Sequence, residues 1–449
     1  MKIRNLILSI SLLMSVLNAT SGNFDNDKGL DIAYKTKYSS AENLFNLTRY
    51  SEALPILLEL DSLSPMNSNI NYYIGLCYLN SSNEKVKAIS FLEKAIKNTS
   101  TSYKSSYDIS AAPTKSFYFL AKAYHLSFKF NEAIAKFQEY KQKASKKDAI
   151  DIIEVDKNIE MCKNAIKLVS NPRNIKVDML GNEINSGNSE YSLASSSDQS
   201  ILIYESALFN NNSIEQKSLG REFYITVLNK DKSKWSTPYK LDSENKSLNT
   251  DNLLSLKTDK KQIFVSKTEN GNSDIFSIAF KNNKSKGVLE WSDLEKLSEN
   301  VNSKSSETNA CVSPDGNTLY FVSNRDGGYG GKDIWASEKQ SDGLWGKPYN
   351  LGPQVNTTSD EECPFLMTDN ATLYFSSKGH NSMGGFDIFT STLSDEGLWT
   401  QTENIGFPIN TPLDDLFFIM SPNEKNAYYS SIKNNGIGNN DIYLITFSE

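Results

Sequence analysis

Five acidic residues recur at one position of a long internal repeat in the C-terminal part of the chain. Each lies eight residues before an Asp that the repeat places in a turn, or before the Asn that replaces it in the last copy; the five are Glu190, Asp251, Glu307, Glu361 and Asp415. Carboxylates around a common opening would create a negative potential able to bind a cation or a Lys- or Arg-bearing loop. Alternatively, each carboxylate accepts hydrogen bonds within its own or the adjacent repeat and has no ligand. Both interpretations are open at this level.

Few other residue patterns could support catalysis or metal binding. The chain has only two histidines, His125 and His380, which disfavours His-rich metal sites and His-dependent triads. No GxSxG, HExxH, P-loop or CxxC pattern occurs. The loop DGGYGGKD, residues 326–333, lacks the alternating carboxylates and terminal Glu of a calcium loop, so we expect Asp333 to bind backbone N–H groups of its own loop. We expect no catalytic residue, no metal and no cofactor.

The acids belong to a repeat that predicts a β-propeller. The segment SPDGNTLYFVSNRDGGYGGKDIW, residues 313–335, recurs as MTDNATLYFSSKGHNSMGGFDIF and as SPNEKNAYYSSIKNNGIGNNDIY, each 54 residues further on. Weaker copies surround Asp198 and Asp259. Each unit reads as a strand, an Asp turn, an alternating strand, a Gly/Asn loop, an Asp-Ile-aromatic strand and a fourth strand beginning at a Gly-x-Trp turn. Four short strands per repeat are typical of a propeller blade, and five units fill residues 174–449.

The two ends of this repeat array predict how the ring closes. The fifth unit stops after its third strand, whereas residues 174–181 resemble the fourth-strand ends of other units. We therefore expect residues 174–181 to pair with the last blade, which leaves no open sheet edge.

Residues 30–170 carry a different, helical period. Ala53, Ala88 and Ala133 each start a similar pattern of small and bulky residues, at spacings of 35 and 45 residues. A period near 34 residues is that of helix pairs in the tetratricopeptide repeat, and the longer spacing indicates an insertion within residues 99–113. The amphipathic segment 148–169 is expected to cap the last pair. The fold class predicted is thus a multidomain α+β chain, with an α-solenoid followed by an all-β five-bladed propeller.

The N-terminus has the pattern of an export signal. Lys2 and Arg4 precede a short apolar run and small residues, which predicts a signal peptide over residues 1–21. No later segment has the ~20 apolar residues that a membrane-spanning helix needs. The net charge of −7 disfavours a nucleic-acid partner. The four cysteines, Cys77, Cys162, Cys311 and Cys363, have no obvious disulfide partners, and free thiols are favoured although the sequence does not decide it.

The order of these features resembles a family of envelope proteins. Tetratricopeptide repeats, the helix IEMCKNAIKLVSNP and TolB-type (WD40-like) propeller repeats with SPDGNTLYFVSNR and GGKDIW form the N-terminal part of OmpA-family periplasmic proteins associated with type IX secretion and gliding. The resemblance implies a non-enzymatic, periplasmic scaffold associated with the outer membrane, whose helical groove and propeller face bind envelope proteins. The OmpA-like domain is absent from this sequence, so peptidoglycan binding is not expected.

Two alternatives stay open. Five-bladed propellers also host glycosidases, which need two carboxylates ~5–9.5 Å apart with one pKa raised. Acids that recur in every repeat, rather than standing out in two, favour an architectural role. A stand-alone carbohydrate- or peptide-binding protein is the third interpretation.

Overall fold

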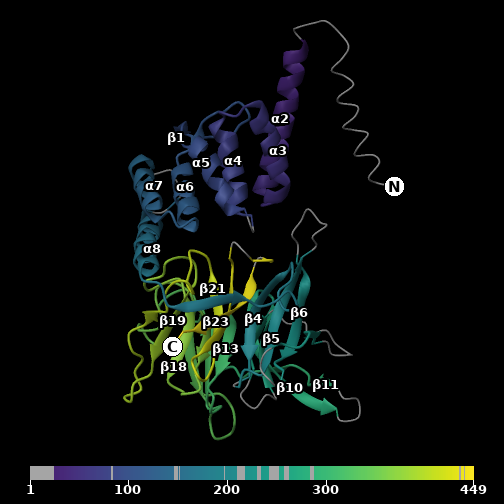
Figure 1. The fold of residues 1–449 in the computed structure, drawn as a ribbon, viewed down its shortest axis with the longest axis vertical. Coiled ribbons are helices and arrows are strands. Elements are labelled where there is room, and N and C mark those ends of the chain that lie inside the picture. The colour runs from purple at the N-terminus through teal and green to yellow at the C-terminus, as the bar shows by residue number, and fades with distance from the viewer. Residues whose placement is uncertain are drawn as a thin grey trace, which may run out of the picture. The chain divides into compact units, whose positions relative to one another are not determined.

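The computed structural model describes residues 25–448 apart from 82–83, 146–149, 151, 197, 210–217, 230–233, 242–251, 257–261, 284–287, 434–435 and 439. The segment expected to be a signal peptide lies outside the described residues. Helices form the N-terminal part and five sheets of four or more strands the C-terminal part (Figure 1). The chain divides into two compact units, one ending at Ser81 and resuming over Lys87–Ser116, and the other comprising Ser82–Val86 and Phe117–Glu449.

The first unit contains two helix pairs. They are α2 (Asp25–Asn46) with α3 (Tyr50–Leu63), and α4 (Ser68–Leu79) with α5 (Ala88–Ala95), which follows a single 3-10 turn, η2 (Lys85–Lys87). Ala53 and Ala88, the small residues of the period, are fully buried. Gly75 of α4 lies so close to α5 that a Cβ there would be 2.5 Å from Cγ of Leu92. Small residues therefore accept bulky ones between paired helices, as the period predicts.

The expected insertion packs against these helices. It runs between two short paired strands, β1 (Thr99–Ser100) and β2 (Ala112–Pro113). The Tyr103 hydroxyl donates to Oδ1 of the buried Asn69 on α4 at 2.6 Å, and the Asn69 N–H donates to the Ser110 carbonyl at 3.1 Å. The Ser105 hydroxyl lies 2.7 Å from the hydroxyl of Tyr38 on α2. The insertion is thus an ordered cover on α2 and α4.

The second unit begins with three helices, α6 (Ser116–Leu126), α7 (Phe130–Lys143) and α8 (Ile152–Ser170). Tyr118 of α6 packs edge-on against Phe137 and Tyr140 of α7, with ring centroids 5.5 and 5.8 Å apart. Two polar side chains bond to one propeller loop. The imidazole of His125 lies 2.7 Å from the Met383 carbonyl, and Asn164 donates to the Ser382 carbonyl at 3.2 Å.

The predicted apolar stripe of α8 is shorter than expected. Val155, Ile159 and Cys162 are buried, whereas Ile152 and Ile166 are exposed. The buried face of α8 instead includes Asn164 and Ala165, and Asn164 contacts the propeller loop.

The propeller has five blades, which confirms the predicted fold class. The strands of blades one and two are β4 (Ser189–Ser195), β5 (Ile201–Phe209), β6 (Ser218–Val227) and β7 (Tyr239–Lys240), then β8 (Asn252–Leu256), β9 (Gln262–Glu269), β10 (Asn272–Asn283), β11 (Val288–Trp291) and β12 (Glu295–Lys296). Those of blades three and four are β13 (Glu307–Val312), β14 (Thr318–Ser323), β15 (Asp333–Glu338) and β16 (Tyr349–Asn350), then β17 (Glu361–Leu366), β18 (Thr372–Ser377), β19 (Asp387–Thr392) and β20 (Glu403–Asn404). Blade five joins β21 (Asp415–Met420), β22 (Asn426–Ser431) and β23 (Asp441–Phe447) to β3 (Ile175–Met179).

The innermost strands β4, β8, β13, β17 and β21 contact one another in that order, and β21 contacts β4 again. At the outer side of blade five, β3 pairs antiparallel with β23, with Met179 opposite Tyr443. The N-terminal strand of the array thus supplies the fourth strand of the last blade. Apolar clusters fill the spaces between neighbouring sheets, for example Val322 and Ile334 of blade three with Leu373 and Phe375 of blade four.

The fourth strands are shorter than the sequence indicates. We expected strands over residues 345–351 and 399–405, but only Tyr349–Asn350 and Glu403–Asn404 join the ladders. Trp345 and Trp399 instead form isolated bridges to Lys339 and Leu393. Each Trp lies in a tight hairpin after the third strand, so its segment meets the sheet again only near its end.

Candidate functional site

The recurrent acids lie inside the blades. Glu307, Glu361 and Asp415 each open an innermost strand and Glu190 is the second residue of β4, and none is more than 1% exposed. Asp251 lies outside the described residues. The four described carboxylates are therefore enclosed, whereas the open acidic rim that the sequence allowed would need them at the surface.

Each of these carboxylates binds groups of its own blade. Glu361 accepts from the Thr357 N–H at 2.8 Å and from the hydroxyls of Thr357 and Ser377, both at 2.7 Å. The same three partners recur four residues before and sixteen after each acid: Ser186 and Ser206 for Glu190, Ser303 and Ser323 for Glu307, and Thr411 and Ser431 for Asp415. The acid thus ties the loop before its strand to the second strand of its blade.

Burial raises the pKa of three of these acids, Glu190, Glu361 and Asp415. It raises the pKa of Glu361 to about 7, against the lowering effect of its hydrogen bonds with Thr357 and Ser377. Burial likewise raises the pKa of Asp415 to about 7, although the positive charge of Lys433 opposes the rise. A carboxyl group that is protonated near neutrality suits general acid catalysis only where substrate can reach it. Here both groups are enclosed.

The Asp-Ile-aromatic motifs also have a structural role, as predicted for Asp333. Its carboxylate accepts from the N–H groups of Tyr329 at 2.5 Å and Gly330 at 3.2 Å, both in the preceding Gly-rich loop. Asp387 and Asp441 accept backbone N–H groups of their loops in the same way. These loops are therefore held by a carboxylate.

A ladder of asparagines joins consecutive blades, and the sequence reasoning missed it. Asn356 accepts from the Ile334 N–H at 2.8 Å and donates to the Ile334 carbonyl at 2.9 Å, which links blade three to the loop entering blade four. The equivalent pairs are Asn302 with Ile275, Asn410 with Ile388, and Asn185 with Ile442 across the ring closure. Each Asn lies five residues before an acid. That constant spacing was the available signal.

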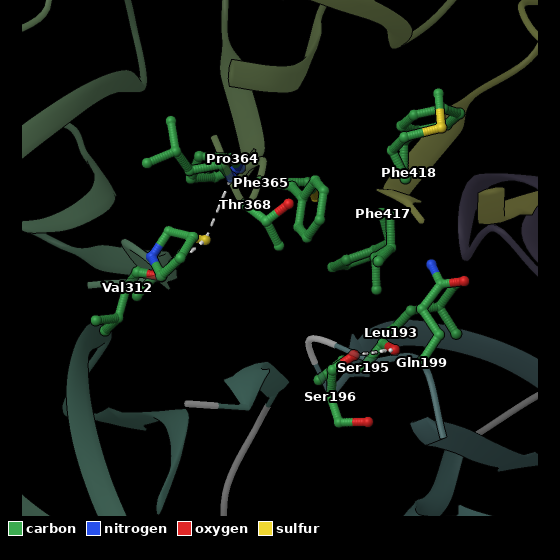
Figure 2. A pocket seen from close by; sticks show the side chains of 18 of the residues that line it. Leu193, Ser195, Ser196, Gln199, Val312, Pro364, Phe365, Thr368, Phe417 and Phe418 are labelled. Atoms are coloured by element: carbon green, nitrogen blue, oxygen red, sulfur yellow. Dashed lines mark hydrogen bonds between the residues drawn. The ribbon is translucent and has the colours of Figure 1, made fainter. Parts of the chain in front are cut away.

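A hollow lies among the innermost strands, beyond the acids along each strand (Figure 2). Among the residues whose side chains the structure describes, twenty line it, from β4, β13, β17 and β21 and from the turns after them, and none of these twenty is charged. The space open to water-sized groups within it is about 80 Å³, and the volume including its open mouth is about 830 Å³. Its described lining is mostly apolar, as in pockets for small molecules.

The lining offers little for acid–base or nucleophilic chemistry. Its described residues include no carboxylate, imidazole or amine, the groups that most often transfer protons. Its two thiols belong to Cys311 and Cys363. Burial raises the pKa of Cys311 to about 11 and raises that of Cys363 well above its usual value, which keeps both as unreactive thiols. The hollow is therefore suited to binding.

Three further findings concern cysteines, metal sites and membrane-spanning helices among the described residues. All four cysteines are buried and free. No cluster of three or more His, Cys, Asp or Glu suited to a metal ion occurs in the part of the chain the structure describes. Within that same part, no helix combines the length and hydrophobicity needed to cross a bilayer.

No protein-family model and no curated protein sequence matches this chain. Among solved structures, it is similar to a putative TolB from Agrobacterium tumefaciens at 18% identity, covering 58% of this chain and 78% of that chain with a TM-score of 0.36. TolB from Acinetobacter baumannii matches at 14% identity over 66% and 71%, with a TM-score of 0.37. A glycoside hydrolase matches at 11% over 64% and 95%, with a TM-score of 0.45. Such likeness concerns the fold and says nothing of activity or partners.

Proposed function

We propose that this chain is a non-enzymatic interaction protein of the cell envelope. It is exported to the periplasm, associates with the outer membrane and binds envelope proteins through its helices and one propeller face, as part of type IX secretion or gliding machinery. The observation that carries the proposal is the use of the acids. The four described members bind their own blades, and the hollow among the innermost strands has no charged side chain among the lining residues that the structure describes.

The same observation weighs against the glycosidase alternative. Hydrolysis of a glycosidic bond needs two carboxyl groups that flank the substrate, one of them protonated. Glu361 and Asp415 have raised pKa values, but both are fully buried and neither lines the hollow. A binding role needs no such pair.

The helices provide surface suited to a protein partner. The helix pairs α2–α3 and α4–α5, with small-to-large packing at Gly75 and Leu92, support tetratricopeptide repeats as their basis. Leu63 at the end of α3 is 63% exposed and Met66 in the next turn is 73% exposed. Exposed apolar side chains on a repeat surface are available for burial against another protein.

Cross-linking and capture from envelope fractions test this proposal. The tagged chain is compared with L63D/M66D in the helical unit and with L344D/L398D, a matched pair of exposed leucines in the propeller. We expect the chain in the periplasmic fraction and the same envelope proteins captured in repeated experiments, with one of the two variants losing them at unchanged thermal stability. Capture that neither variant alters, together with turnover of oligosaccharides or peptides by the purified chain, would overturn the proposal.

A further inference from the structure

Gln199 differs from its counterparts in the other blades. It occupies the ninth position after the acid, in the turn between the first and second strands, where Gly316, Asn370 and Glu424 are the equivalents. Gln199, Gly316, Asn370 and Glu424 all have left-handed backbone, with φ of 52°, 79°, 57° and 56° respectively. The turn, and not the side chain, therefore determines the backbone conformation at this position. Asn370 and Glu424 are exposed and Gly316 is half-buried, whereas Gln199 is only 9% exposed. The turn does not require a buried amide at this place.

The Gln199 side chain is part of the wall of the hollow, into which it extends (Figure 2). Its Nε2 is buried and has no hydrogen-bond partner among the groups that the structure describes. A buried donor without an acceptor costs about 1–3 kcal/mol, so such a group calls for an explanation. A ligand that brings an acceptor oxygen would satisfy it.

Three other polar side chains of the described lining are already engaged. Ser195 donates to the Ser196 carbonyl at 3.0 Å, and the Ser196 hydroxyl donates to Asp198 at 2.7 Å. Asn309 donates through Nδ2 to Glu362 at 3.0 Å. A sugar would bury several hydroxyls against these occupied groups, and each hydroxyl left without a partner is costly. A ligand with a single acceptor, bonded to Gln199, leaves no polar group of its own without a partner.

The rest of the described lining is mainly apolar and carries no charge. Phe365 and Phe417 are half-buried on neighbouring innermost strands, and Leu193 lies on the same strand-and-turn unit as Gln199. Rings of this kind bind a hydrocarbon or aromatic group by removing its surface from water. A charged group would be desolvated there without a countercharge, which disfavours it strongly.

We propose that the hollow is a binding site for an uncharged, mainly hydrocarbon ligand with a single carbonyl oxygen, which accepts a hydrogen bond from Gln199 Nε2. The apolar part of the ligand packs against Phe365 and Phe417. The site does not depend on the envelope partner, because every residue invoked belongs to the propeller.

A matched series of small probes tests the site by ligand-observed NMR titration of the full chain. N,N-dimethyl-3-phenylpropanamide carries one carbonyl and a phenyl group, 3-phenylpropanoate adds charge, propylbenzene lacks the acceptor, and methyl glucoside carries only hydroxyls. We expect the amide to bind at least tenfold more tightly than the carboxylate and the glucoside, and several-fold more tightly than propylbenzene. Equal binding of amide and carboxylate, or tighter binding of the glucoside, would overturn the proposal.

Variants then test the role of Gln199. Gln199→Met keeps the length of the side chain but removes the donor, and we expect the affinity for the amide to fall roughly three- to tenfold, to the level of propylbenzene. Glu424→Met alters the same turn position in blade five, outside the hollow, and should leave the affinity unchanged. Gln199→Glu, a second variant should the first fail to fold, should also lose the amide. Wild-type affinity in a folded Gln199 variant would refute the assignment.

Discussion

The buried carboxyl group of Glu361 predicts an unusual pH dependence of propeller stability. Burial raises its pKa from an ordinary 4.5 to about 7, so the folded state retains a proton that the unfolded chain releases. Between pH 4.5 and 7 the folded state binds more protons, and the free energy of unfolding therefore falls as pH rises. A shift of about 2.5 pH units corresponds to about 3 kcal/mol, at 1.36 kcal/mol per unit.

The Glu361→Gln variant removes this titration. From pH 4.5 to pH 8, the free energy of unfolding of the variant should rise by about 3 kcal/mol relative to that of wild type. The test depends on this change with pH and not on the difference between the two proteins at any one pH. Urea unfolding at several pH values, followed by tryptophan fluorescence, measures it, because all five tryptophans lie in residues 235–399 and report the propeller alone. The exposed Glu424→Gln is the control and should show a constant difference.

Two results would refute this reasoning. A constant difference between Glu361→Gln and wild type would mean that burial does not favour the protonated acid. A difference of opposite sign would mean that the hydrogen bonds from Thr357 and Ser377 outweigh desolvation and hold the carboxylate charged.

Three further predictions follow from single contacts. Burial lowers the pKa of His125 from 6.5 to about 4, so between these pH values the unfolded state binds a proton that the folded state does not. The free energy of unfolding should therefore fall by about 3 kcal/mol as the pH drops from 6.5 to 4. His125→Gln should remove this pH dependence, as measured by calorimetry. Asn356→Ala leaves the Ile334 N–H buried without its acceptor and should cost about 1–3 kcal/mol in urea unfolding, whereas the exposed Asn381→Ala should cost almost nothing. Gly75→Ala forces a methyl group against Leu92 and should destabilise the helical unit by about 1–3 kcal/mol in thermal unfolding by circular dichroism; an unchanged melting temperature would contradict the close packing of α4 on α5.

The sequence predicts the fold class because both periods are long and regular. The 54-residue repeat with its Asp-Ile-aromatic strands specifies five blades, and the small residues at Ala53 and Ala88 specify paired helices. The position of each acid follows from the same repeat. The burial of the acid does not follow, because a residue that opens an innermost strand can turn either to the centre of the ring or to its own blade.

The hollow could not be predicted from any one repeat. Its described lining combines residues from four blades, and the distinguishing group, Gln199, occupies a turn position that is exposed in blades four and five and half-buried in blade three. Only the closed ring brings that amide beside Phe417. The asparagine ladder, in contrast, could have been predicted, because an Asn lies five residues before each of four acids.

The central claim is that the recurrent acids hold the propeller together instead of forming a charged site. Urea unfolding of E307A/E361A/D415A, followed by tryptophan fluorescence and paired with capture of envelope proteins, tests it most directly. Each substitution leaves a buried backbone N–H without its acceptor, so the account predicts that the cooperative transition moves to much lower urea or disappears. A variant that unfolds like wild type but no longer captures its partners would contradict the claim.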